Sequence, residues 1–211
     1  MRSVPWMRTA VASLVICATG GALLWRGTDG FRAFTTEQAR RLAVARNPRA
    51  LPVVALDDQN GQPFTLASYR GAPLAVDFVY TQCVSVCTLL SASFERLDRA
   101  ERARAAGGGG GNRLQLVTIT FDPRDTPEHL RAYASRYHAD GRDWRFARVH
   151  DPRELSSLLG AFGITVIPDG RGDFQHNAAV HVVDAEGRLA RVLDIGVDPR
   201  DVVRTLAESR R

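Results

Sequence analysis

Short apolar runs alternate with amphipathic stretches from residue 53 onward, and this alternation constrains the fold more than any other feature of the chain. A short apolar run fits a buried strand, whereas apolar residues three and four apart fit one face of a helix. Strands that alternate with helices form β–α–β units, which predicts an α/β domain built on one sheet. We expect strands at residues 53–56, 63–66, 74–80, 114–121, 145–149, 178–183 and 189–195.

Helices are expected in the gaps between these strands. The first covers about residues 87–105, with one apolar and one charged face, and the glycines at residues 107–111 terminate it. A turn at residues 184–187 makes the last two strands antiparallel, so the sheet is mixed, with helices on both faces. Three further helices are expected to begin where a capping residue precedes a proline, at Thr126-Pro127, Asp151-Pro152 and Asp198-Pro199.

An uncharged and mostly apolar stretch precedes this domain. It covers the 17 residues 9–25, between Arg8 and Arg26, which as a helix would span roughly 26 Å at ~1.5 Å per residue. Basic residues before such a stretch are typical of a signal peptide or a signal anchor, and the sequence leaves open whether it is cleaved or retained. We expect the membrane to be contacted through residues 9–25.

The chain is therefore expected to have three parts. Residues 1–30 form a signal anchor or transmembrane helix, residues 31–52 a stalk linker, and residues 53–211 the folded domain. The anchor places this domain on the exported side of the membrane, in the periplasm or another extracytoplasmic space.

The charge balance argues against a nucleic-acid partner. The chain has a formal net charge of +5, but from residue 35 onward 24 arginines face 22 acidic residues. That near-neutral balance gives the folded part no positive footprint for a phosphate backbone. The excess arginines lie around the apolar stretch instead.

Two of the three cysteines belong to the exported part. Cys83 comes just after the strand at residues 74–80, and Cys87 lies near the start of the helix that follows. A disulfide between them is allowed in an exported protein, but it would close too short a loop to stabilise the fold much. If residues 83–87 are helical, both thiols lie on one face near a helix N-terminus, which favours thiolates. The pair therefore predicts either disulfide exchange or binding of a soft metal ion.

A metal at this pair needs a further ligand. Two thiolates are too few for a closed zinc site but, with one imidazole, suit Cu(I). His176 lies at the end of a Gly- and Asp-rich loop before the strand at residues 178–183, and His181 lies inside that strand. On the residues alone, either could be a ligand or a structural residue. The others are interpreted as residues of helix surfaces or element ends: His129, His138 and His150.

Three segments in this order and spacing point to a known family. The first is the C-x-x-x-C motif of Cys83 and Cys87, which follows FVYT at residues 78–81. The second is TFDPRDTPEHLRAY at residues 120–133, and the third is HNAAVHVVDAEGRL at residues 176–189. Over most of the folded part, the chain resembles the Sco/SenC family of membrane-anchored copper proteins.

The resemblance implies a thioredoxin-like fold, related to that of peroxiredoxins. In this family the two motif cysteines and the histidine before the late strand bind copper, so Cys83, Cys87 and His176 are the implied ligands of a copper ion, Cu(I) or Cu(II). The chain departs from the family at Thr88, where many members have proline, and in the glycine insertion at residues 107–111. Neither departure removes a ligand.

The resemblance also implies a function. The family assembles the dinuclear copper centre of cytochrome c oxidase, so the chain is expected to be a copper metallochaperone for the copper-binding subunit of that oxidase. A copper donor protein or a thioredoxin-like reductant would be a second partner. The alternative is a thiol–disulfide oxidoreductase in which Cys83 and Cys87 form a redox-active pair, reducing the oxidase cysteines or another exported protein. Whether the chain is an enzyme therefore stays open.

Other functions fit the residues less well. Thioredoxin-like enzymes resemble one another in having two residues between their cysteines, whereas this chain has three between Cys83 and Cys87. A peroxidase of the related fold has threonine three residues before its reactive cysteine, whereas Thr81 lies two before Cys83. A binding module with an incidental disulfide would predict that serine at both cysteines leaves oxidase assembly unchanged. Asp122 and Asp125 are interpreted as turn and capping residues, while Asp77 either faces water or reaches toward the site.

Overall fold

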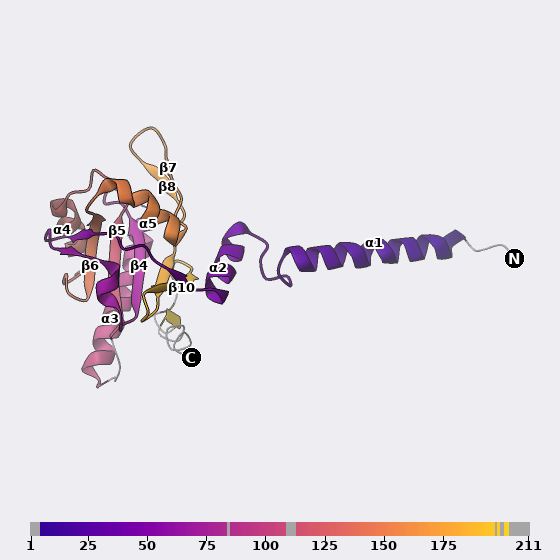
Figure 1. Ribbon diagram of the computed structural model, residues 1–211, viewed down its shortest axis with the longest axis horizontal. Coiled ribbons are helices and arrows are strands. Elements are labelled where there is room, and N and C mark those ends of the chain that lie inside the picture. The colour runs from indigo at the N-terminus through magenta and orange to yellow at the C-terminus, as the bar shows by residue number, and fades with distance from the viewer. Residues whose placement is uncertain (1–4, 84, 109–112, 197, 199–200, 203–211) are drawn as a thin grey trace. The chain divides into compact units, whose positions relative to one another are not determined.

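The computed structural model describes residues 5–83, 85–108, 113–196, 198 and 201–202. The chain divides into two compact units, Met1–Arg46 and Asn47–Arg211. The described residues of the first unit form two helices, α1 (Pro5–Gly27) and α2 (Thr36–Arg46). The second unit contains the sheet and the other helices (Figure 1).

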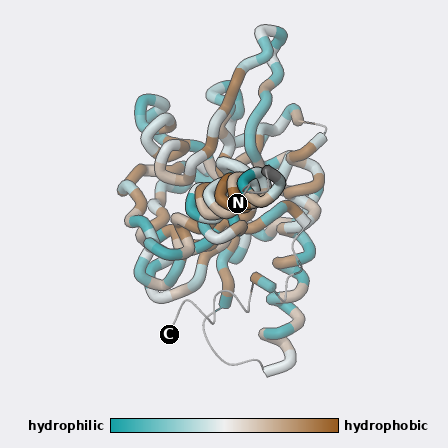
Figure 2. Tube along the Cα trace, turned by 90° about the vertical axis from the view of Figure 1, so that its right-hand side faces the viewer, coloured by the Kyte–Doolittle hydropathy of each residue, from teal (hydrophilic) through white to brown (hydrophobic). Residues whose placement is uncertain are grey.

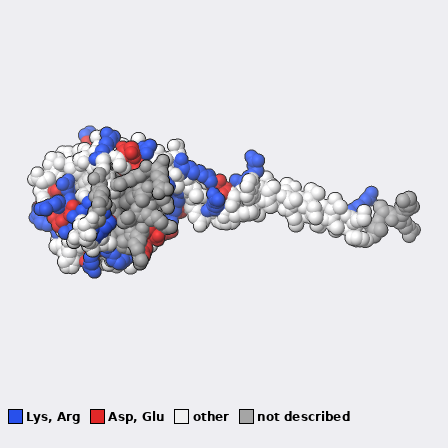
Figure 3. Space-filling model, turned by 90° about the horizontal axis from the view of Figure 1, so that it is seen from below, with Lys and Arg blue, Asp and Glu red and all other residues white. Residues whose placement is uncertain are grey.

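Helix α1 is longer than the apolar stretch that predicts it. Its 23 residues give a length of about 34 Å at ~1.5 Å per residue, enough to cross a hydrocarbon core of about 30 Å. Trp6–Gly27 has a mean hydropathy of 1.6 and is, within the described part of the chain, the one helix long and apolar enough to span a membrane. Its only charged side chains are Arg8 and Arg26, near its two ends (Figure 3).

An eight-stranded mixed sheet forms the centre of the second unit, in the order β1-β10-β9-β4-β5-β6-β2-β3. The three strands β4 (Leu74–Val79), β5 (Gln115–Thr120) and β6 (Trp144–Val149) are parallel, because a helix connects each to the next. On either side, β9 (Val180–Val183) and β2 (Leu56–Asp58) run antiparallel to their neighbours. The outer strands are β10 (Arg188–Leu193), β1 (Arg49–Ala50) and β3 (Pro63–Phe64).

Helices cover both faces of this sheet, as the sequence predicts. On one face, α3 (Val86–Ala106) and α4 (Pro127–Arg136) pack against the aromatic side chains of β6. The ring centroids of Phe94 and Trp144 are 6.0 Å apart, and those of Tyr133 and Phe146 are 5.7 Å apart. Because side chains alternate along a strand, β4 also presents side chains to the other face. There α5 (Leu155–Phe162) packs against it. Two short 3₁₀ helices complete the unit, η1 (Leu66–Tyr69) and η2 (Pro152–Glu154).

Some predicted elements differ from the structure. The expected strand at residues 53–56 is wrong except at Leu56, where β2 begins, and the run at residues 63–66 is a two-residue strand followed by η1. The helix expected at Asp151-Pro152 begins as η2 before it continues as α5. Pro199 and residues 109–111 of the glycine loop lie outside the described residues.

A second, two-stranded sheet is absent from the sequence prediction. The strands β7 (Val166–Pro168) and β8 (Phe174–His176) pair as an antiparallel hairpin. This hairpin projects from the domain in both ribbon and tube views, and its tip is hydrophilic (Figures 1 and 2). Its Gly- and Asp-rich connection predicts a loop, because that composition is poor in strand-forming residues. His176 therefore ends a strand rather than a loop.

The start of α4 provides a test of its predicted cap. Thr126 accepts a hydrogen bond from the His129 backbone N–H at 3.3 Å, and Pro127 occupies the first helical position. Replacing Thr126 with alanine is expected to lower the free energy of unfolding by about 1 kcal/mol. Urea unfolding measures this loss, and Thr126→Ser, which keeps the hydroxyl, is the control. Equal stabilities of the alanine and serine variants would contradict the assignment.

Candidate metal centre

The two cysteines lie at the junction of β4 and α3. Cys83 lies in the turn after β4, where its N–H donates to the carbonyl oxygen of Tyr80 at 3.2 Å, and Cys87 is the second residue of α3. The expected placement of Cys83 after the strand and Cys87 near the helix start is confirmed, but the condition that residues 83–87 are all helical is not met, because the helix begins only at Val86. Cys83 is 6% exposed and Cys87 is fully buried, and both are free thiols.

His176 reaches the thiol of Cys87 from the other end of the sequence. Its Nε2 lies 3.5 Å from Cys87 Sγ, and its Nδ1 lies 3.2 Å from the carbonyl oxygen of Asn177. Since a carbonyl oxygen only accepts, Nδ1 carries the proton and Nε2 has the lone pair that faces the sulfur. A backbone carbonyl that holds Nδ1–H in this way is the usual support for a metal-binding imidazole.

Aromatic rings surround this imidazole. The ring centroid of His176 lies 4.8 Å from that of Phe121 and 6.4 Å from that of Tyr80. Burial among these rings lowers the pKa of His176, against the opposing effect of the Asn177 carbonyl. The imidazole is therefore neutral at pH 7, which is the form that binds metals.

The two thiols have opposite tendencies to ionise. Burial opposes ionisation of Cys83, but a hydrogen bond from Cys87 and the backbone N–H groups at the start of α3 lower its pKa. Burial raises the pKa of Cys87 well above its usual range, and the neighbouring Cys83 raises it further. The expectation that both thiols favour the thiolate form therefore agrees with the direction of the pKa shift at Cys83 but not at Cys87, which is fully buried.

The structure brings together only part of the expected ligand set. Cys87 and His176 are in contact, and Cys87 is near enough to Cys83 to lower the pKa of that thiol. Across the described ranges, however, no group of three His, Cys, Asp or Glu side chains is arranged closely enough to hold a metal ion. The donors fit a soft ion in kind, two sulfurs and one imidazole nitrogen, and to bind one ion together these side chains would have to move closer to one another.

The other histidines lie away from this centre. His181 is fully buried on the α5 face of the sheet, where its ring centroid is 5.3 Å from that of Phe162 and its Nδ1 is 3.3 Å from the carbonyl oxygen of Val76. Two of the remaining histidines pair with surface carboxylates, His138 with Glu95 and His150 with Asp57. His129 is part of the cap of α4.

Asp77 is buried in the middle of β4, on the face covered by α3. Neither of its carboxyl oxygens has a hydrogen-bond partner of normal geometry among the described residues. The Thr118 hydroxyl on the paired strand lowers the pKa of Asp77, but burial has the larger, opposite effect. Burial raises the pKa of Asp77 to about 8. Of the two alternatives for this residue, the wet edge is therefore excluded, because the side chain has no exposure to water.

Sequence reasoning missed residues that shape the site. Tyr80, three residues before Cys83, packs against the His176 ring and donates a hydrogen bond to Asp173 on the β7–β8 hairpin. Arg124 donates to the carbonyl oxygen of Gly172 on the same hairpin at 2.7 Å. Neither contact has a sequence signal, because each joins segments more than forty residues apart.

Together, the sheet order and the site define a class of protein, a thioredoxin-like domain with a thiol pair after its first parallel strand and an imidazole beside it. The pattern of the SCO1/SenC family matches residues 51–210. The chain belongs to the SCO1/SenC family.

Relatives and solved structures agree with this placement. The chain is 31% identical over 191 residues to a candidate copper-binding protein of Stutzerimonas stutzeri, with 88% of each chain covered. It is similar to Bradyrhizobium japonicum ScoI, whose structure contains copper, with a TM-score of 0.61, 25% identity, and coverage of 75% of this chain and 98% of that one. A second structure is that of BsSco, from the Sco family of cytochrome c oxidase assembly proteins, with a TM-score of 0.61, 19% identity, and coverage of 77% of this chain and 94% of that one. This last likeness shows the fold alone.

Proposed function

We propose that the chain is a copper metallochaperone. It would hold one copper ion through Cys83, Cys87 and His176 and pass it to the copper-binding subunit of cytochrome c oxidase, for the dinuclear centre of that enzyme. The observation that carries the proposal is the contact of Cys87 Sγ with His176 Nε2 at 3.5 Å, across 89 positions of sequence. Family membership and copper binding by a relative support it.

The donor atoms suit copper as a cargo. Two sulfurs and a neutral imidazole match the softness and low coordination number of Cu(I). Binding would displace the proton of Cys87, because that thiol is protonated at neutral pH while Cys83 is poised to ionise. Proton uptake at Cys87 would in turn favour release of the ion to an acceptor.

The protein would act at a membrane surface. Helix α1 would anchor the chain, and the copper-binding unit would lie on the exported side of the membrane. The length and hydropathy of Trp6–Gly27 support the anchor.

A second candidate function is thiol–disulfide exchange. The asymmetry of the thiols favours it, because a thiolate at Cys83 would attack a disulfide and the thiol of Cys87, once deprotonated, would resolve the mixed disulfide. The partner would leave with two thiols, and Cys83 and Cys87 would become a disulfide. This reaction needs no imidazole.

Replacing His176 with alanine is expected to separate the two functions. Copper affinity of the full chain in detergent, titrated anaerobically after reduction, should fall by about 100-fold, because one of three ligands is lost. The rate of dithiol oxidation by a small disulfide should stay within about twofold, since exchange depends on the sulfurs alone.

Three outcomes decide between the functions. Tight binding of one copper equivalent by the parent chain, with charge-transfer absorption from sulfur, supports the metallochaperone. An unchanged copper affinity in His176→Ala contradicts the proposed ligand set. A parent chain that binds no copper but exchanges disulfides favours the second function.

A further inference from the structure

The β7–β8 hairpin presents His176 from a projecting element, so its position depends on a few contacts with the rest of the unit. The hairpin tip is a tight turn in which the Asp169 carboxylate accepts from the N–H groups of Arg171 and Asp173. At the base, the side-chain Nδ2 of Asn177 donates a hydrogen bond to the carbonyl oxygen of Gly163, at the end of α5, at 2.9 Å. Between tip and base, Tyr80 donates a hydrogen bond to Asp173, and further contacts come from the segment that follows β5.

Arg124 is the first of these contacts. Its Nη2 donates to the carbonyl oxygen of Gly172 at 2.7 Å, and its guanidinium carbon lies 5.4 Å from the ring centroid of Phe174. Asp122 holds the guanidinium in place, because the Arg124 Nε and Nη2 donate to the two carboxylate oxygens at distances of 2.6 to 3.0 Å. The Asp122 side chain is fully buried, whereas that of Arg124 is partly exposed. Asp122 therefore holds the guanidinium from the interior, and the guanidinium contacts the hairpin.

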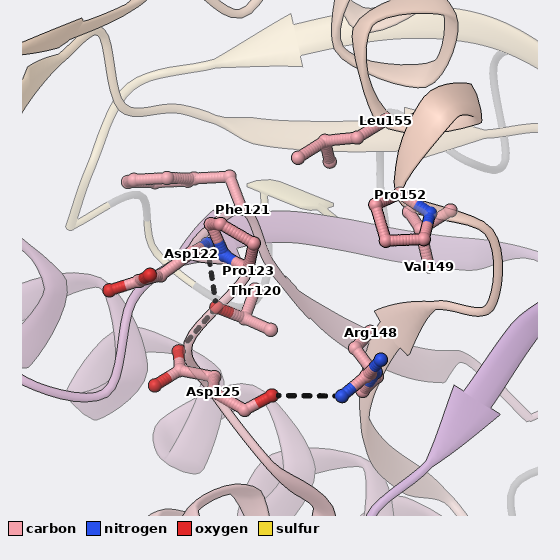
Figure 4. Close-up of a pocket in the computed structure, with 9 residues that line it drawn as sticks. All are labelled: Thr120, Phe121, Asp122, Pro123, Asp125, Arg148, Val149, Pro152 and Leu155. Atoms are coloured by element: carbon pink, nitrogen blue, oxygen red, sulfur yellow. Dashed lines mark hydrogen bonds between the residues drawn. The ribbon is translucent and has the colours of Figure 1, made fainter.

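Asp125 makes the corresponding contact with the cysteine segment. One carboxylate oxygen accepts from the N–H of Thr81 at 3.0 Å, and the other accepts from the Thr81 hydroxyl. The Thr120 hydroxyl donates to the same carboxylate, and Arg148 donates to the Asp125 carbonyl oxygen at 3.4 Å (Figure 4). Thr81 is two residues before Cys83, so the start of the cysteine turn is tied to the end of β5.

One turn thus contacts both segments that carry the proposed ligands. We propose that residues 120–125, here called the bracket, position the metal centre: Asp125 fixes the turn that carries Cys83, and Arg124, oriented by Asp122, fixes the hairpin that carries His176. The inference rests on the proposed function, in which these ligands meet at one ion. Its residues are positioning residues, since none of them is a proposed ligand.

Arg124→Gln tests the hairpin arm of the bracket. The variant should bind copper about 10-fold more weakly, as is typical when the support of a ligand is lost. In the copper-free chain, the backbone amides of residues 166–176 should exchange with solvent about 10-fold faster, because the Gly172 contact is gone. Arg124→Lys should rescue little of either, since an ammonium cannot reproduce the planar fork that joins Asp122 to Gly172.

Arg153→Gln is the matched control. Arg153 pairs with Asp151 in the same spacing and through the same two nitrogen atoms, but its side chain is 89% exposed. Its replacement should change neither copper affinity nor exchange in the hairpin. Equal effects of the two variants would overturn the inference, because they would show a general effect of lost charge.

A double variant separates positioning from a merely structural role. If Arg124 acts through His176, then Arg124→Gln should cost no further copper affinity in a chain that already has His176→Ala. Additive losses would overturn the inference. If His176→Ala alone leaves the affinity unchanged, the proposed ligand set is wrong, and the amide exchange rates alone decide whether Arg124 holds the hairpin.

Thr81→Val tests the contact between Asp125 and the turn that carries Cys83, because valine has a shape similar to that of threonine but no hydroxyl. Loss of one hydrogen bond to Asp125 should raise the rate of Cys83 alkylation about threefold at constant pH, while exchange in the hairpin stays as in the parent. Thr81 is only half-buried, so the variant is expected to fold, and its thermal midpoint checks this. An unchanged alkylation rate would overturn this arm of the inference.

Discussion

A chain in which serine replaces both Cys83 and Cys87 is expected to bind copper about 1,000-fold more weakly than the parent, or not measurably. Thiolates are the soft ligands of the proposed centre, and a hydroxyl does not replace them for Cu(I). The remaining imidazole of His176 is then a lone neutral ligand in an aromatic pocket. Competition with a Cu(I) chelator of known affinity measures the loss.

Cys17 provides the matched control for this variant. It is the third free cysteine and is exposed on α1, so Cys17→Ser should leave copper affinity unchanged. Because Cys87 is fully buried, the thermal midpoint of the double variant must be measured, and Cys83→Ser alone serves if the double variant does not fold. Parental affinity in either folded variant would rule out the two-sulfur centre.

The parallel part of the fold could be predicted from the sequence because each of its elements has a strong local signal. The strands β4, β5 and β6 are each rich in apolar and β-branched or aromatic residues, and the pairs Thr126-Pro127 and Asp151-Pro152 mark where helical segments begin. The edge strand β1 and the two strands of the separate hairpin, β7 and β8, were not predicted. Each is only two or three residues long, so its formation depends on a partner strand rather than on its own composition.

The candidate site was predictable in its members but not in its support. The motif spacing indicates Cys83 and Cys87, and the family resemblance adds His176, whose contact with Cys87 is then seen in the structure. The different ionisation of the two thiols could not be predicted, because it depends on burial. The contacts of Arg124 with the hairpin and of Asp125 with Thr81 are tertiary, and the sequence shows Asp125 only as an ordinary turn residue.

Replacement of the buried Asp77 is expected to increase stability. Burial raises its pKa to about 8 in the folded chain, whereas an unfolded aspartate has a pKa near ~3.9. Between these two values the folded state binds a proton that the unfolded state has lost. The contribution of Asp77 to stability should therefore be greatest below about pH 4 and fall as the pH rises, by up to ~1.4 kcal/mol per pH unit, until about pH 8.

Asp77→Asn removes this proton linkage with almost no change of shape. We expect the variant to be more stable than the parent at pH 7 by roughly 2–4 kcal/mol, and the gain to shrink toward pH 4, where both side chains are neutral. Urea unfolding of the two full chains in detergent, at pH values from 4 to 8, measures the difference. Other titrating groups, such as His176 and Cys83, are common to both chains and cancel in it.

Asp122→Asn is expected to have the opposite effect, which makes it the control for the sign of this prediction. Burial opposes ionisation of Asp122, but the Arg124 guanidinium beside it lowers the pKa of that carboxyl. Its charged form therefore stabilises the fold, and the stability is lost as the pH falls through the lowered pKa. Asparagine at this position should cost stability at pH 7.

If the Asp77→Asn curve instead ran parallel to that of the parent from pH 4 to pH 8, Asp77 would have to be ionised in the fold. A buried carboxylate needs a hydrogen-bond or charge partner, and among the described residues neither oxygen of Asp77 has a hydrogen-bond partner.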